Sequence, residues 1–200
     1  MRRRTKFPAM LAIGLCFSFA AMAAPVEVFA PPFVRACETC HGRFGNSRRS
    51  RVPRINGQIA HYIVRRLNQL GQAPAPSEDG PYTKAHDRTM SDQVKAQIAA
   101  YFAEMPPTPP DYQAVSSLGV KIYFQGSPSR HIAPCAYCHG GHGEGNGPIP
   151  RLAGQHKAYL KVRLDMLSGF ILPGSGAMHI AVQRLTPAEI DAVASYLAAQ

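Results

Sequence analysis

One pentapeptide pattern constrains this chain more than any other feature, because it occurs twice. Cys37-Glu38-Thr39-Cys40-His41 lies near the N-terminus, and Cys135-Ala136-Tyr137-Cys138-His139 follows 98 residues later. Two cysteines three positions apart can each form a thioether bond to the same porphyrin, and the next histidine can bind its iron as the proximal ligand. The motifs therefore predict two covalently bound haem c groups. The predicted attachment residues are Cys37, Cys40, Cys135 and Cys138, and the predicted iron ligands are His41 and His139.

Other chemistry is open to cysteines spaced in this way. A structural zinc site can use two such cysteine pairs, but 98 residues between them exceeds the usual zinc-ribbon spacing. A thiol redox pair needs a strand before it and a helix after it, and does not require the histidine. Structural disulfides would leave both histidines unexplained. Haem attachment is the interpretation that uses all six residues.

The N-terminus has the three parts of a secretory signal peptide. A basic start is followed by an apolar run over 10–20 and by the small-x-small sequence Ala21-Met22-Ala23. The apolar run is too short for a comfortable membrane span. We predict a signal peptide over 1–23 that is cleaved after Ala23, with an uncleaved anchor as the alternative. Export to the periplasm agrees with haem attachment, which takes place outside the bacterial cytoplasm.

The two halves of the chain repeat one another beyond the cysteine motifs. The segment Pro53-Arg54-Ile55-Asn56-Gly57-Gln58 recurs as Pro150-Arg151-Leu152-Ala153-Gly154-Gln155. Between the halves lies the run Pro106-Pro107-Thr108-Pro109-Pro110, which a helix cannot cross. We predict two duplicated domains joined by a proline-rich linker. Their bounds are 24–105 for the first domain, 106–114 for the linker and 115–200 for the second.

The apolar pattern predicts an all-α fold. Leucine and isoleucine recur at helical spacing in each half: Ile59, Ile63, Leu67 and Leu70 in the first, and Leu160, Leu164 and Leu167 in the second. Thr186 is the expected N-cap of the last helix, with Pro187 at its first position and Glu189 completing a capping box. Ser91 starts the matching helix in half one. The glycine-rich stretch 140–147 predicts turns.

Basic residues exceed acidic residues, and the excess is concentrated in one segment. The formal net charge is +10, and no acidic residue lies between positions 43 and 66. This segment should attract a redox partner with an acidic docking surface. Nucleic acid is the other class of partner for a basic patch, but we do not expect it for a secreted haem protein. The arginines of the segment are Arg43, Arg48, Arg49, Arg51, Arg54, Arg65 and Arg66.

The combination of motifs resembles the tandem class I cytochromes c, especially the cytochrome c4 type. The resemblance rests on two Cys-x-x-Cys-His-Gly motifs, two Pro-x-x-x-Gly-Gln segments and two closing helices with an aromatic residue, and it covers almost the whole mature chain. It implies two small helical domains, each wrapped around one covalent haem. It also implies a periplasmic electron carrier with His/Met iron that delivers electrons to a terminal oxidase.

The resemblance further implies a methionine ligand between the middle and last helices of each domain. Met178 lies there in half two, in a glycine-rich loop. In half one the final helices align Thr83 with Met178, while Met90 lies immediately before Ser91 and His86 lies nearer the expected place. We expect Met178 and Met90 to be the sixth ligands. In half one the alternatives are His86 and an open site or another ligand.

Class I cytochromes c also orient the proximal histidine through a proline carbonyl. Pro53 lies twelve residues after His41, and Pro150 lies eleven residues after His139. These two prolines are the candidates for accepting the Nδ1 proton of each histidine.

Three functions fit these features. The first is transfer of single electrons between a respiratory donor and a terminal oxidase or reductase. The second is a di-haem peroxidase-like enzyme, which would need an iron that can open. The third is a dedicated cytochrome subunit of a dehydrogenase or oxidase complex. We favour the electron carrier, with no catalytic residue, no small-molecule substrate, and contact with a membrane only through partner complexes.

Overall fold

The computed structural model describes residues 30–72, 90–110, 116–169 and 176–200. Within these ranges the regular structure is helical, and the only strand-like features of the described residues are two isolated bridges. The prediction of an all-α fold is confirmed. The signal-peptide region, Thr83, His86 and part of the linker lie outside the described residues.

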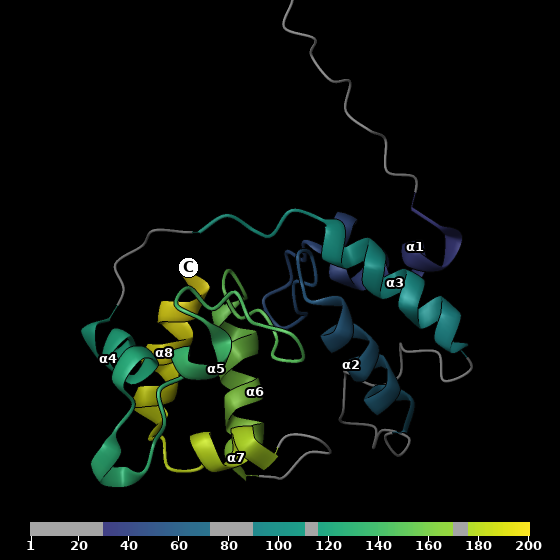
Figure 1. Ribbon diagram of the computed structural model, residues 1–200. Coiled ribbons are helices and arrows are strands. Elements are labelled where there is room, and N and C mark those ends of the chain that lie inside the picture. Colours follow the sequence, from purple (N-terminus) through teal and green to yellow (C-terminus); the bar gives the residue numbers. More distant parts are fainter. Residues whose placement is uncertain (1–29, 73–89, 111–115, 170–175) are drawn as a thin grey trace, which may run out of the picture.

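The described residues of half one form three α-helices and a short 3-10 helix. These are α1 (Pro32–His41), η1 (Arg43–Gly45), α2 (Ala60–Gln72) and α3 (Asp92–Glu104). Both α1 and α2 pack against α3 (Figure 1). The predicted apolar face of α2 is confirmed, because Ile63 and Leu67 are buried. The core of half one consists of Val34, Ile63, Leu67, Ile98, Ala99, Tyr101, Phe102 and Met105.

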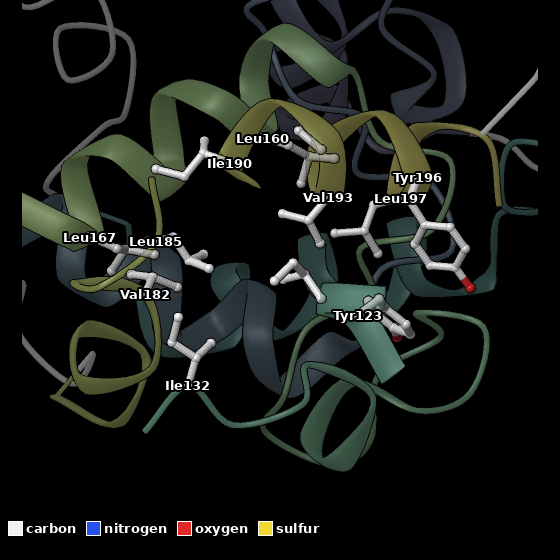
Figure 2. Packing of buried hydrophobic residues seen from close by; sticks show 12 residues of the cluster. Tyr123, Ile132, Leu160, Leu167, Val182, Leu185, Ile190, Val193, Tyr196 and Leu197 are labelled. Atoms are coloured by element: carbon white, nitrogen blue, oxygen red, sulfur yellow. The ribbon is translucent and has the colours of Figure 1, made fainter. Parts of the chain in front are cut away.

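Half two is organised around its last helix. Its elements are α4 (Ser117–Gln125), η2 (Pro128–Arg130), α5 (Ala136–His139), α6 (Lys157–Gly169), α7 (Gly176–Val182) and α8 (Pro187–Ala198). Helices α4 and α6 both pack on α8, and α7 packs on α6. Figure 2 shows side chains of α6, α8 and the segment before α8 converging on a common interior. Each half thus has an apolar cluster of its own.

The helix starts are set by local hydrogen bonds. The Thr186 hydroxyl accepts from the Glu189 N–H at 3.3 Å, and the Glu189 carboxylate accepts from the Thr186 N–H at 2.9 Å. This is the predicted capping box, with Pro187 at the first helical position. The Ser91 hydroxyl accepts from the Val94 N–H at 3.3 Å, so the predicted start of α3 is also confirmed. These caps satisfy backbone donors that would otherwise lack a partner.

Candidate haem-binding sites

The first cysteine motif forms the last turns of α1. Cys37 packs against the core of half one, and burial together with the neighbouring Glu38 raises the pKa of its thiol. The Nδ1 atom of His41 lies 2.8 Å from the carbonyl oxygen of Pro53. With Nδ1 as the proton donor, the lone pair of the imidazole lies on Nε2, the nitrogen that can bind iron.

The second motif has the same arrangement on a shorter helix. Cys135 is the residue immediately before α5, and burial raises the pKa of its thiol to about 11. His139 is only 4% exposed, and its Nδ1 atom lies 3.0 Å from the carbonyl oxygen of Pro150. Both predicted histidine–proline hydrogen bonds are therefore confirmed. Burial lowers the pKa of His41 and His139 against the opposing effect of these bonds, which favours the neutral, ligating form of each imidazole.

Each motif is also held by a tyrosine from a helix outside it, and no sequence signal indicated the Tyr123 contact. The Tyr123 hydroxyl donates to the carbonyl oxygen of Gly140, the residue after His139. In half one the Tyr101 hydroxyl donates to the Glu38 carboxylate at 3.3 Å. Buried tyrosines need such partners. As a result, the end of the second motif and the second residue of the first motif are each fixed to the helical core of their own half.

The two candidate methionines lie against the two cores. Met178 packs against the core of half two, and Met90 packs against that of half one, immediately before the N-cap Ser91. The expectation that Met178 lies in a loop is wrong, because it is part of α7. Burial of Val182 against the core and packing on α6 stabilise this short helix despite the nearby glycines.

The residues present fit haem in two further respects. The four motif cysteines are free thiols. The Nε atom of Arg151 is buried and has no hydrogen-bond partner among the described residues. A buried guanidinium nitrogen without a partner is costly, and a carboxylate is its natural acceptor. Haem carries two propionates, which are carboxylates that could accept a hydrogen bond from this nitrogen. No three histidine, cysteine, aspartate or glutamate side chains in the described ranges form a group that could hold a metal ion.

The two halves meet through the repeated segments 53–58 and 150–155, which lie between the two groups of helices in Figure 1. Gln155 Oε1 accepts from the Arg54 N–H at 2.9 Å, and Gln155 Nε2 donates to the Arg54 carbonyl at 2.8 Å. Gln58 makes the equivalent pair with the backbone of Arg151, at 2.8 and 2.9 Å. Each glutamine is 7% exposed. The repeated Pro-x-x-x-Gly-Gln pattern was the sequence signal of this interface. That the glutamine of each half binds the backbone of the other half was not predicted.

The arginine-rich segment does not form one continuous exposed face. Arg54 donates through Nη1 to the carbonyl oxygen of Gly154 at 2.5 Å, inside the interface. Arg43, Arg48, Arg49 and Arg51 are exposed, and three of them line a surface cavity that also includes Cys40. The expected patch is therefore smaller than seven arginines, and its exposed part lies beside the first cysteine motif.

No helix among the described residues combines the length and the apolar character needed to cross a bilayer.

Comparison with known proteins places these features in a family. A profile of the family described as cytochrome C oxidase, cbb3-type, subunit III, matches residues 129–197. Cytochrome c4 of Thiocapsa roseopersicina is 34% identical over 80% of this chain and 85% of the relative. A protein of Thiomonas intermedia named thiosulfate dehydrogenase electron acceptor is 27% identical over 86% of this chain and 81% of its own length. The crystal structure of reduced recombinant cytochrome c4 from Pseudomonas stutzeri matches with a TM-score of 0.74 and 27% identity, covering 84% of this chain and 94% of that chain.

Proposed function

The chain belongs to the cytochrome c4 family of electron carriers, and we propose that it transfers single electrons in the periplasm between a respiratory donor and a terminal oxidase or reductase. The single observation that carries this proposal is the duplicated motif with its duplicated support. Each Cys-x-x-Cys-His segment is followed by a proline whose carbonyl oxygen accepts a hydrogen bond from the motif's histidine.

Two haem c groups are the cofactors that this proposal requires. Cys37 and Cys40 would attach the first, and Cys135 and Cys138 the second. Covalently bound haem supplies an iron that changes its charge by one electron. His41 and His139 would be the proximal ligands, each held in one tautomer by its proline carbonyl.

Methionine is the proposed sixth ligand in both halves. Met178 and Met90 each pack against the core of the half that holds the corresponding motif. A thioether ligand favours reduced iron and raises the potential, which suits delivery of electrons to an oxidase. We assign no catalytic residue to the chain.

The deciding experiment asks whether two haems are covalently bound. We expect the exported protein, denatured and extracted with acidified organic solvent, to retain its colour and the mass of two haems. The Cys135→Ser/Cys138→Ser variant should retain one haem, attached through half one. Colour lost to the solvent, or a colourless protein, would rule out the proposal. N-terminal sequencing should show a mature chain that begins at Ala24.

The ligand of the first haem needs its own test. The near-infrared methionine-to-iron charge-transfer band should amount to two equivalents per chain, falling to one in Met178→Ala and to one in Met90→Ala. Retention of both equivalents in Met90→Ala would exclude Met90 as the ligand. If the wild-type protein shows one equivalent, His86→Ala tests whether imidazole binds the first iron. Rapid binding of peroxide or carbon monoxide at one haem would instead favour a peroxidase-like enzyme.

We propose that an acidic partner docks at the four exposed arginines Arg43, Arg48, Arg49 and Arg51. Complementary charge increases association rates most at low ionic strength. Arg48→Glu/Arg49→Glu should therefore slow electron transfer from an acidic donor by roughly tenfold at low salt and much less at high salt. The control is Lys121→Glu, which reverses an exposed charge on α4 in half two. Equal slowing by both variants would argue against this docking site.

A second candidate is a dedicated cytochrome partner of a dehydrogenase or oxidase complex. It is favoured by the similarity to the Thiomonas intermedia electron acceptor and by the oxidase-subunit profile that matches half two. Co-purification with such an enzyme through a high-salt wash would support this candidate. Release of the cytochrome by salt would support a free carrier, since transient charge-guided contacts weaken as ions screen them.

A further inference from the structure

We propose that each half of the chain tunes the haem of the other half through a single peptide group. The positioning residues are Gln155, which acts on the His41 site, and Gln58, which acts on the His139 site. The inference rests on the haem attachment proposed above.

The key observation concerns the peptide group between Pro53 and Arg54. Its carbonyl oxygen accepts from His41 Nδ1 at 2.8 Å, and its N–H donates to Gln155 Oε1 at 2.9 Å. A trans peptide directs its C=O and N–H to opposite sides, and the described residues contain no cis peptide. One amide therefore connects the proximal histidine of half one to a side chain of half two.

The same chain of bonds occurs in the opposite direction. The Pro150 carbonyl accepts from His139 Nδ1 at 3.0 Å, and the Arg151 N–H of that peptide donates to Gln58 Oε1 at 2.8 Å. Two independent copies of one arrangement show that it is a property of the repeated segment.

The glutamine side chains are held in place for this contact. Gln58 Oε1 also accepts from the Ile59 N–H at 2.9 Å, and Gln155 Oε1 also accepts from the His156 N–H at 3.1 Å. Each Nε2 donates to the carbonyl of the arginine whose N–H the same side chain accepts. Oxygen facing two donors and nitrogen facing an acceptor is the amide orientation that satisfies every group.

The physical consequence follows from polarisation along hydrogen-bonded chains. An acceptor on the N–H side of an amide increases the negative charge on its carbonyl oxygen, which strengthens the bond to the imidazole. A stronger bond at Nδ1 makes the imidazole a better electron donor and stabilises oxidised iron. Each glutamine should therefore lower the potential of the haem across the interface.

The test replaces each glutamine with methionine, which has a similar volume but lacks both the amide donor and the strong acceptor. The holo-protein is titrated, and the potential of each haem is followed through its own hyperfine-shifted methyl resonances. Gln155→Met should raise the potential of the haem at Cys37 and Cys40 and leave the haem of its own half unchanged. Gln58→Met should give the mirror-image result. Loss of a partner that hydrogen-bonds a metal ligand typically changes metal affinity or activity by about tenfold or more. The glutamine is one hydrogen bond further from the iron, so we expect about a threefold shift in the reduction equilibrium, which is about 28 mV for one electron.

Two further readouts separate this role from simple docking of the halves. Hydrogen exchange at the Arg54 amide should accelerate in Gln155→Met, and exchange at the Arg151 amide in Gln58→Met. The Nδ1 proton of the histidine across the interface should shift upfield in the reduced protein. His156→Leu is the matched control, because it removes the bond from His156 Nε2 to the Ser47 carbonyl at 2.8 Å, which crosses the interface without touching either proline peptide.

Potential shifts confined to the opposite haem, absent in His156→Leu, would support the proposal. Equal shifts at both haems, shifts in the glutamine's own half, no shift, or the same pattern in the control would overturn it. Should neither variant fold, the amide exchange and the Nδ1 proton shifts are measured in Gln155→Glu, because its carboxylate keeps the acceptor for the Arg54 N–H. We expect the His41 Nδ1 proton to shift downfield in this variant. Absence of that shift counts against the proposal. Absence of covalent haem would be seen in the spectrum beforehand, and would refute the proposed function instead.

Discussion

Replacing Gly119 with alanine should destabilise half two, because α4 and α8 cross at this residue with no room for a side chain. A Cβ atom at position 119 would lie 2.3 Å from the Ala192 carbonyl oxygen and 3.1 Å from Tyr196 Cβ. Ordinary van der Waals contact begins at 3.4 Å, so the helices would have to separate by about 1 Å.

The cost of that separation can be estimated from what α4 buries. Ile122 is 2% exposed and Tyr123 is fully buried, and both pack in the core of half two. A buried side chain makes roughly 40–60 contacts of about 0.1–0.2 kcal/mol, and a gap of up to 1 Å loses about a quarter or more of that energy. Two such side chains lose roughly 4 kcal/mol in this way. Alanine returns about 1 kcal/mol through its helix propensity, and tilting of α4 recovers more, so we expect a net loss of about 2–3 kcal/mol.

The assay is guanidinium unfolding of the haem-loaded protein, followed by circular dichroism. Gly169→Ala is the matched control, because it lies at the end of α6, and a Cβ atom there would have no heavy atom of the described residues within 4 Å. That variant should be unchanged or more stable by up to about 1 kcal/mol. If Gly119→Ala gained stability like the control, the close crossing of α4 and α8 would be disproved. Displacement of α4 should also weaken the Tyr123 bond to Gly140, so the second haem should be attached less completely.

Three further predictions concern helix starts and pH. Thr186→Ala should lower the unfolding free energy by about 1 kcal/mol, measured by chemical denaturation, because the Glu189 N–H loses its acceptor. Ser91→Ala should cost less than about 1 kcal/mol in the same assay, because this cap is exposed and lacks a capping box. Hydrogen bonds from the Arg130 guanidinium lower the pKa of Glu189 from 4.5 to about 2. Because the pKa of Glu189 is lower in the folded than in the unfolded protein, its stabilisation is complete above pH 4.5 and is lost as the pH falls towards 2. Thermal melts should show this loss of stability, and the loss should be smaller in Glu189→Gln.

Features that depend on near neighbours in sequence could be predicted. The Thr186 capping box joins residues three apart, and the predicted face of α2 repeats every three or four residues. The histidine–proline bonds span twelve and eleven residues, and were predicted because the family resemblance supplied their geometry. Short-range patterns and a known fold therefore account for the parts of the site that were anticipated.

Features that depend on distant pairs could not be predicted in this way. Gln58 and Gln155 find their partners 93 and 101 residues away, so the repeat marks both glutamines but does not indicate which residues they contact. The basic neighbours of Arg54 predict a charged surface, yet its guanidinium donates across the interface. The glycines around Met178 predict a loop, whereas packing on α6 makes the segment helical.

The duplicated segment explains why the two halves meet where they do. The proline carbonyl must face the histidine of its own half, so the following N–H points away from that half and needs an acceptor. Because this N–H is buried away from water, it needs an oxygen acceptor within hydrogen-bond distance. The glutamine side chain of the other copy provides that oxygen. Because the copies carry the same hexapeptide pattern, a single relative placement satisfies both donors at once, as expected for a two-fold contact between equivalent surfaces. The orientation of the histidine in each half is thereby linked to the docking of the halves, and a change in one copy of the segment must affect the site in the other.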